Sequence, residues 1–519
     1  MSVVEREGGD ITAADMVYAP TEPSLIQEYF NDAIIFITGA TGFLGKLLVE
    51  KLLRVCNIRQ IYVLIRPKYG KTSEERFHAY FDDVVFDRLR RENYEAVQNV
   101  VLVDGDCAKP RLGLNDEDLT ELRQVNCVFH CASTAYFDDK LVPAVMVNIG
   151  GVTEILSQCQ KMPNLKSIIC MSTVYTHSAG QEISEAFYNV PLSGNDLLTL
   201  IAILKEPMAE NVASVIIGNW PNVYTFTKAV TEDVIKKNSS KLPLAIVRHS
   251  LVIGTAKEPV SGWVNSFYGA SGIFAGISLG LVRTLHVEPN NLTDLVPADY
   301  VVNCMLAASY DIALKKSINA NDEVCLSPSL DNIPIYNYVS TQQKAITWRT
   351  TLEMILSHIE QVPLSFQIRH AILIPTPNKY LFLILQFLLH TVPGYFTCFN
   401  ETTQFYTHMK KFLNAFTYFT LQRWIFRNSN VEKLWEKLNV EDRKYFEFGM
   451  HNFDWDLYFR TNVRGLRVYL LKDPIDTIPA GQTRLRTLKI LHYGLVVFVS
   501  ACFTLGVTCT FFNYCITWF

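Results

Sequence analysis

Tyr224 and Lys228, four residues apart in GNWPNVYTFTK, have the side chains and the spacing for proton transfer. Four residues are about one helical turn, so both side chains would lie on one helical face, and Pro221 predicts a helix that has Tyr224 in its first turn. A phenol with a pKa near ~10 is a poor acid at neutral pH, but a neighbouring ammonium lowers that pKa. The same spacing also occurs by chance, with a buried tyrosine beside a surface lysine.

Two hydroxyls in the segment MSTVY, Ser172 and Thr173, can complete a reaction centre. Adding hydride to a carbonyl requires a proton donor, a group that lowers the donor's pKa, and a second hydrogen bond that orients the carbonyl. Tyr224, Lys228 and one of these hydroxyls would fill those roles. Because side chains alternate along a strand, which hydroxyl contacts a substrate stays open.

The glycines of TGATGFLG form a GxxGxxG pattern between an apolar run and a helix-period segment. Such glycines allow a tight turn and a close approach of a pyrophosphate to the helix amides. An ordinary glycine-rich turn is the alternative, but a position between strand and helix favours a dinucleotide site. The loop residues expected to bind the cofactor are Gly39, Thr41, Gly42, Phe43, Leu44 and Gly45.

Positive charge follows the second apolar run, at Arg66, Lys68 and Lys71. An NAD-selective site usually carries an acid here, whereas basic residues suit the 2′-phosphate of NADP. A solvated basic loop is the alternative for the lysines. Asp106 is expected to accept a hydrogen bond from the adenine amino group, although aspartate is also a common turn former.

Short apolar runs alternate with helix-length segments through the first part of the chain, which predicts a parallel, doubly wound, Rossmann-type α/β sheet. From about residue 335 the pattern becomes aromatic and helix-periodic. We expect a tail at 1–27, a nucleotide-binding reductase domain at 28–334 and a mostly helical domain at 335–480. The expected strands are 33–38, 61–65, 100–103, 127–130, 167–171 and 244–247.

The composition is apolar for a soluble protein, with 49% hydrophobic and 19% charged residues among 519, which points to a membrane or a lipid. A net charge of −4 argues against nucleic acid as a partner. The 12 cysteines follow no metal-binding or disulfide spacing, so no metal is expected, and a reducing compartment is.

Residues 490–519 contain no Asp, Glu, Lys or Arg and are long enough to cross a bilayer; a buried core helix is the alternative. Arg484, Arg486 and Lys489 precede them, which predicts a cytosolic domain on that flank. The shorter apolar segment 380–396 is expected to be an interfacial helix or, alternatively, a core helix.

Taken together, these motifs resemble the extended short-chain dehydrogenase/reductase superfamily, and within it the alcohol-forming fatty acyl-CoA reductases. The resemblance covers about residues 28–480 and includes a C-terminal domain that general dehydrogenases lack. The segments that carry it are TGATGFLGKLLVEKLLR, IYVLIRPKYGKTSEERF, GDC, VFHCAST with FDD, MSTVY, PNVYTFTKA, EPVSGWVNS, LVPADYVVN and FDWDLYFRTNVRGLRVYLLKD.

The resemblance implies that long-chain acyl-CoA is reduced to fatty alcohol with two NADPH, through a hemithioacetal and an aldehyde. Tyr224 would donate the proton, Lys228 would tune it and hold the nicotinamide ribose, and Thr173 with Ser172 would bind the carbonyl oxygen. One position departs from the family's pattern: Arg-Pro-Ser is replaced by Arg248-His249-Ser250.

Two other functions compete with this interpretation, a membrane-bound sterol or steroid dehydrogenase and an NADP-binding scaffold without turnover. The expected location is the endoplasmic reticulum membrane, with the peroxisome membrane as the alternative, since the chain ends in ITWF without a peroxisomal address. The motifs do not indicate the length of the acyl chain, the oligomeric state or the protein partners.

Overall fold

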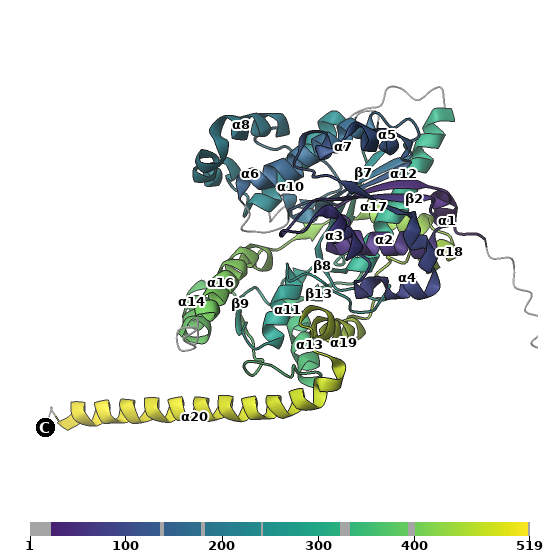
Figure 1. Ribbon diagram of the computed structural model, residues 1–519. Coiled ribbons are helices and arrows are strands. Elements are labelled where there is room, and N and C mark those ends of the chain that lie inside the picture. Colours follow the sequence, from purple (N-terminus) through teal and green to yellow (C-terminus); the bar gives the residue numbers. More distant parts are fainter. Residues whose placement is uncertain are drawn as a thin grey trace, which may run out of the picture.

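The computed structural model describes residues 22–134, 140–177, 182–239, 242–321, 333–392 and 400–516. Most of the expected tail, the FDD segment at 137–139, and the end of the 380–396 segment lie outside these residues. The described chain forms an upper lobe around a large sheet and a lower lobe of helices, from which one long helix projects (Figure 1).

Seven parallel strands form the central sheet, in the order β12-β7-β5-β4-β1-β2-β3. Six of them confirm the predicted strands, and the seventh, β12, starts at the position where the helical domain was expected to begin. The strands are β1 Ile34–Thr38, β2 Gln60–Ile65, β3 Val100–Asp104, β4 Cys127–His130, β5 Ser167–Thr173, β7 Leu244–His249 and β12 Ile335–Tyr338.

Helices cover both faces of the sheet, as the doubly wound fold requires. Alternate residues of β1 point to opposite sides: Ile35 and Ile37 belong to one apolar core, and Ile34 and Phe36 to the other. Figure 1 shows α2 (Phe43–Val55) on one side of the sheet and α7 (Gly151–Cys159) and α10 (Val223–Asn238) on the other. The helix α12 (Ala298–Asn321) packs on α2, β5 and β7.

Shorter elements complete the upper lobe and join it to the lower one. The remaining helices of this part are α1 Leu25–Phe30, α3 Ser73–His78, α4 Asp87–Glu92, α5 Asp116–Glu121, α6 Leu141–Val145, α8 Gly194–Asn211 and α9 Ala213–Ile217. The two-stranded pairs are β6 Glu182–Ile183 with β15 Ile425–Phe426, β8 Leu251–Ile253 with β11 Leu295–Pro297, β9 Thr284–His286 with β14 Ile374–Thr376, and β10 Leu292–Thr293 with β13 Ile346–Thr347.

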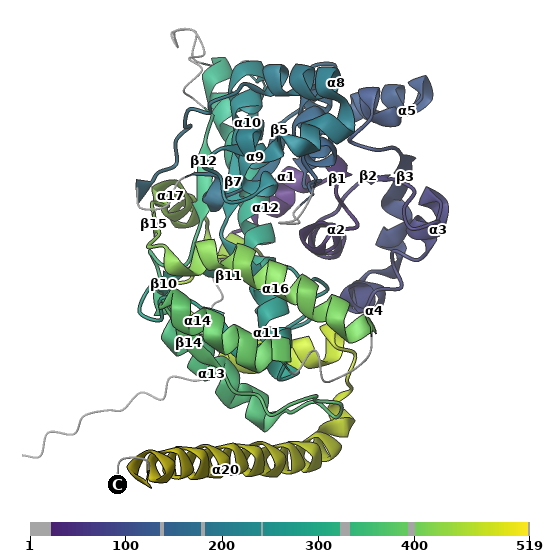
Figure 2. The same cartoon turned by 90° about the vertical axis from the view of Figure 1, so that its left-hand side faces the viewer.

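The lower lobe is mostly helical, as predicted, but it also takes in α11 (Ala270–Ser278) from the first half of the chain. Figure 2 shows α11 between α13 and α16, below the sheet. Its other helices are α13 Trp348–Gln361, α14 Lys379–Gln386, α16 Asn400–Leu421 and α19 Trp455–Gly465, whereas α17 Ser429–Lys437 and α18 Val440–Tyr445 pack on β12, α12 and α1 of the upper lobe. Each lobe therefore contains segments from both halves of the chain.

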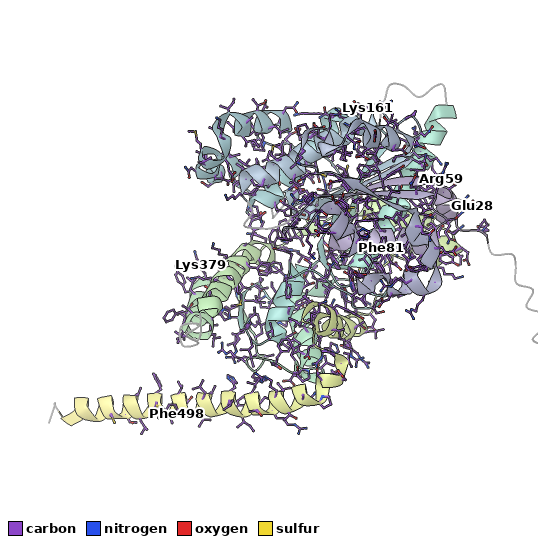
Figure 3. All side chains as sticks on the ribbon, viewed as in Figure 1. Glu28, Arg59, Phe81, Lys161, Lys379 and Phe498 are labelled. Carbon is purple, nitrogen blue, oxygen red and sulfur yellow. The ribbon has the colours of Figure 1, made fainter. Side chains whose placement is uncertain are left out.

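The last helix, α20 (Ile478–Ile516), leaves the lower lobe and extends away from it (Figure 2). The stretch Ile475–Cys509 is long and apolar enough to cross a membrane, and its most apolar window has no buried residue. Figure 3 shows side chains, Phe498 among them, projecting around this helix without a neighbouring element. The helical stretch Leu141–Cys159 passes the same test but packs on the sheet, with 56% of its window buried.

The helix α14 and the π-helical turn Phe387–Thr391 form the described part of the 380–396 segment. Phe382, Gln386 and His390 are buried on one side. The other side is apolar and exposed, which a helix enclosed in a core would not be. Its exposed side chains are Tyr380, Leu381, Leu383, Ile384, Phe387 and Leu388.

Candidate active site

The turn after β1 brings the backbone unusually close to the neighbouring strand. Gly39 has a φ of +73°, and a Cβ atom there would lie 2.5 Å from the backbone nitrogen of Ala132. A Cβ at Gly45 would lie 2.2 Å from the Gly39 oxygen, so the first turn of α2 packs directly on the loop. Gly42 begins α2 without a side-chain cap. The arrangement leaves the first amides of α2 for an anion and fits a dinucleotide pyrophosphate.

Basic side chains gather beside this turn, at the ends of β2 and α3. The Arg66 guanidinium lies 3.3 Å from the Asp106 carboxylate, and Arg76 donates to the Thr41 hydroxyl at 3.2 Å and to the Arg66 carbonyl. Burial and the charge of Arg66 both lower the pKa of Arg76. Two cations held close together fit an additional phosphate. Asp106 also accepts from the Ala108 amide at 3.0 Å, which is the turn-forming role considered for it.

Arg76 was not among the predicted site residues. It lies ten positions after Arg66, on a separate helix that begins with a Thr72–Glu75 capping box. Spacing within the loop could not have found it, because the fold of α3 back over the turn brings it to Thr41.

The predicted start of the tyrosine helix is confirmed: α10 begins at Val223, with Tyr224 in its first turn. The Asn222 side chain caps it by accepting from the Thr225 amide at 2.9 Å. One turn on, the Lys228 ammonium donates to the Met171 carbonyl of β5 at 2.9 Å. Burial raises the pKa of Tyr224 and lowers the pKa of Lys228 to about 8. The helix thus sets Lys228 against the end of β5, with Tyr224 one turn before it on the same helix.

The two candidate hydroxyls point to different partners. Ser172 donates to the Glu232 carboxylate at 2.6 Å, whereas Thr173 donates to the His249 carbonyl at 3.1 Å. Glu232 lies one turn beyond Lys228 and also receives Arg248 Nε at 2.9 Å and Nη2 at 2.6 Å. Ser172 is therefore part of a buried ionic network, and Thr173 ends the strand beside β7.

Sequence reasoning missed Glu232, although a signal was present. Positions 224, 228 and 232 repeat every four residues, so a carboxylate at the third of them continues the same helical face. Burial alone would raise the pKa of Glu232, but Arg248 and hydrogen bonds lower it to about 2. The side chain of Arg248 is fully buried, and its charge is balanced at this carboxylate.

His249 pairs in register with Thr173, across β5 and β7. Its Nδ1 lies 2.8 Å from the carbonyl oxygen of the next residue, and burial lowers its pKa to about 4. The imidazole is therefore neutral near pH 7. On β4, burial lowers the pKa of His130 to about 3, and its Nδ1 lies 2.8 Å from the Thr38 hydroxyl; it is a strand residue rather than a ligand.

A cavity of about 910 Å³ runs along the carboxyl ends of the strands and down into the lower lobe. At its upper end it is lined by the predicted residues Gly39, Thr41, Gly42, Phe43, Arg66, Lys68 and Asp106, and by Arg76. At its lower end it is lined by apolar side chains of α11 and α16. Leu44 and Gly45 belong to the first turn of α2 behind the lining.

The tyrosine centre lies next to the cavity rather than in its lining. Cys131 lines the cavity, and its thiol lies near enough to Lys228 that the ammonium lowers the thiol's pKa against the larger, opposite effect of burial. Residues 131–134, immediately after β4, line the cavity on this side. The cavity thus joins the glycine-rich turn, which fits a dinucleotide, to an apolar groove. It also passes close to Lys228.

Solved structures with this fold include reductase domains. The terminal R domain from the myxalamid PKS-NRPS biosynthetic pathway has a TM-score of 0.54 at 18% identity, covering 86% of this chain and 93% of its own. The R domain of a nonribosomal peptide synthetase from Mycobacterium tuberculosis also has a TM-score of 0.54, at 16% identity, with 83% and 92% covered. At these identities the similarity concerns the fold.

Two family models described as "Male sterility protein" match the chain, an NAD-binding one over residues 37–305 and a second over 380–473. Fatty acyl-CoA reductase wat of Drosophila melanogaster is 35% identical over 481 residues, which are 91% of this chain and 90% of that protein. Fatty acyl-CoA reductase 1 of Homo sapiens is 31% identical over 479 residues, with 90% of each chain covered. With one model matching about half of the chain and relatives of 31–35% identity along about 90% of its length, the chain belongs to the fatty acyl-CoA reductase family.

Proposed function

We propose that the protein reduces long-chain fatty acyl-CoA to fatty alcohol with NADPH as the electron donor. The observation that carries this proposal is one cavity of about 910 Å³, which joins a dinucleotide turn to an apolar groove and passes Cys131, whose thiol lies near Lys228. An enzyme that brings a polar nucleotide to a fatty acyl group needs a polar end and an apolar end within the same cavity. The names of the relatives agree with this substrate.

The choice of NADPH over NADH rests on Arg66, Lys68 and Arg76. An extra phosphate on the adenosine ribose carries negative charge, which guanidinium groups bind through charge-assisted hydrogen bonds. Arg66 is 43% exposed at its side chain, so it can turn from Asp106 towards a phosphate without leaving a buried charge behind. When bound, the dinucleotide supplies the hydride.

Tyr224 is the proposed proton donor. The lowered pKa expected for this phenol is not found in the structure: burial raises the pKa of Tyr224, so the phenol is protonated at neutral pH but is a weaker acid than free tyrosine. The Lys228 ammonium, one turn away, would stabilise the phenolate that remains. Thr173 is the hydroxyl proposed to orient the carbonyl, because Ser172 is held in the buried ionic network of Glu232 and Arg248, whereas Thr173 is the last residue of β5 and donates to a backbone carbonyl.

The proposed overall reaction consumes two NADPH and two protons for each acyl-CoA and yields one fatty alcohol, CoA and two NADP⁺. The first hydride adds to the thioester carbon, and the C–S bond then breaks to release CoA and an aldehyde. The second hydride adds to the aldehyde carbon, and a proton from Tyr224 completes the hydroxyl.

A purified full-length protein in detergent tests the reaction directly. We expect NADPH oxidation and alcohol formation with long-chain acyl-CoAs, in a ratio of about two NADPH to one alcohol. Tyr224→Phe should lower kcat by at least about a hundredfold, the usual scale of general acid catalysis, with NADPH affinity retained. Tyr310→Phe, which removes a hydroxyl from α12 away from the cavity, is the matched control. Near-normal turnover in Tyr224→Phe would exclude the proposed donor.

We also propose that α20 anchors the protein in a membrane, with the catalytic lobes in the cytosol. The basic residues Arg484, Arg486 and Lys489 lie at the domain end of the apolar stretch, as they do on cytosolic flanks. The exposed apolar side of α14 would lie in the interface of the same bilayer. The expected membrane is that of the endoplasmic reticulum, with the peroxisome as the alternative.

Membrane attachment is measured by fractionation of cells that express the protein. Deleting residues 485–519 should move most of it to the soluble fraction, and any fraction that stays should be released by adding Leu383→Glu and Phe387→Glu on α14. Leu292→Glu, an exposed leucine outside both helices, is the control. Complete retention after all these changes would contradict the proposal.

A further inference from the structure

The lower half of the cavity is a groove between two helices that are distant in sequence. From α11 and its C-terminal end, Ile273, Gly276 and Leu279 line one side; from α16, Met409, Phe412 and Leu413 line the other. Ile273 and Leu413 are each 3% exposed, and Leu279 and Phe412 are half-buried, so the groove is buried at its centre and partly open at its edge. We refer to these six residues as the α11–α16 groove.

The groove is chemically unlike the upper half of the same cavity. Its six residues carry no polar side-chain group, whereas the nucleotide end carries three basic residues and a carboxylate. A dinucleotide has phosphates, riboses and amides that such a wall cannot hydrogen-bond. The part of a ligand that fits an apolar wall is a hydrocarbon, since each methylene removed from water improves binding by about fourfold.

The position of α16 relates the groove to the exterior of the molecule. In both views α16 lies beside α14, on the side towards which α20 extends (Figures 1 and 2). In Figure 3, Lys379, where α14 begins, lies at the same outer edge. The inner side of α16 lines the groove, and the neighbouring α14 carries the exposed apolar face, so a hydrocarbon in the groove lies near the surface proposed to meet the bilayer.

We propose that the α11–α16 groove holds the fatty chain of the substrate and that the bulk of its side chains sets which chain lengths react. This inference rests on the proposed acyl-CoA reduction and adds the location of the chain within the protein. Phe412 and Leu279 are the positions where a change in side-chain volume alters the groove most simply, because both are half-buried and line it.

The experiment measures kcat/KM for saturated acyl-CoAs of increasing chain length. Leu279→Trp fills the groove and should lower kcat/KM for the longest chains by about tenfold or more, while the shortest chains change little. Phe412→Ala enlarges it and should move the optimum to longer chains. Tyr418→Ala, an aromatic truncation on the same helix outside the cavity lining, should leave the length profile unchanged. The KM for NADPH and the melting temperature show that each variant is folded.

A second measurement does not depend on turnover: the affinity of the same proteins for fatty alcohols of increasing length. Leu279→Trp should weaken binding of long alcohols selectively. If the wild type reduces acyl-CoA but neither variant changes the length dependence of rate or binding, the groove assignment is wrong and the proposed reaction stands. If the wild type is inactive but alcohol binding shifts as expected, the reaction is wrong and the groove stands.

Discussion

Replacing Glu232 with leucine removes the carboxylate that binds side chains from the carboxyl ends of β5 and β7. That carboxylate accepts from Ser172 and twice from Arg248. Its pKa of about 2, against an ordinary 4.5, means that the ionised form favours the folded protein by about 3 kcal/mol. Because the pKa is depressed, this stabilisation is present above pH 4.5 and is lost as the pH falls towards 2.

The expected loss in Glu232→Leu is at least about 3 kcal/mol, since Arg248 would remain buried without its partner. At about 2.1 cal/mol/K per residue, a cooperative unit of about 300 residues would lose about 5 °C in Tm. The assay is thermal unfolding of the detergent-solubilised protein near pH 7, with Arg248→Met and the double variant completing a cycle.

The cycle separates the ion pair from ordinary packing. The double variant should lose less than the sum of the two single variants by about 2 kcal/mol or more, because neither partner is then left as an unpaired buried charge. Additivity within about 0.5 kcal/mol would refute the reasoning, since the two side chains would then act independently.

Three further predictions concern the reaction itself. Thr173→Ala should lower kcat by about a hundredfold with little change in Tm. Ser172→Ala should instead lower Tm and retain most of kcat, because the Ser172 hydroxyl donates to Glu232 in the buried ionic network. The opposite result for the two variants would exchange the proposed roles. Arg76→Ala should raise the KM for NADPH by about tenfold and leave that for NADH unchanged, and an equal effect on both would remove the phosphate role. The rate of reduction should be constant below pH 8 and fall above it, because the pKa of Lys228 is about 8 and its charged form is required; a rate that rises through pH 8 would contradict this.

The central sheet could be predicted because its strands are buried on both faces. Runs such as Ile34–Thr38 are mostly apolar and end at glycines or charges. Their identity as buried strands and their positions along the chain therefore follow from the sequence. The start of α10 could also be predicted from the sequence, because Pro221 and the capping residue Asn222 define it. Local signals sufficed wherever one segment fixes its own conformation.

Features that arise only from tertiary contacts could not be predicted from the sequence. The strand β12 carries tyrosines and an asparagine, and its pairing with β7 depends on a chain return that no local pattern encodes. Arg76 reaches the nucleotide turn through the packing of α3. The α11–α16 groove joins residues that are 130 or more positions apart in the sequence, so neither helix alone indicates a cavity.

The junction between the lower lobe and α20 has a mechanical consequence. The helix is continuous from Ile478 to Ile516, and its first turns are held by close packing of Gly481 on the Pro363 carbonyl and by Arg484 donating to the Gln367 carbonyl. A continuous helix transmits rotation as well as distance, at about 100° for each residue. In the proposed membrane-bound enzyme, one alanine inserted after Lys489 would therefore turn the lobes by about 100° relative to the membrane-buried part of the helix and move them out by only about 1.5 Å, whereas seven inserted residues would nearly restore the angle but move α14 about 10 Å from the bilayer. The length of helix between the lobes and the bilayer would thus decide how far the apolar side of α14 lies from its lipid.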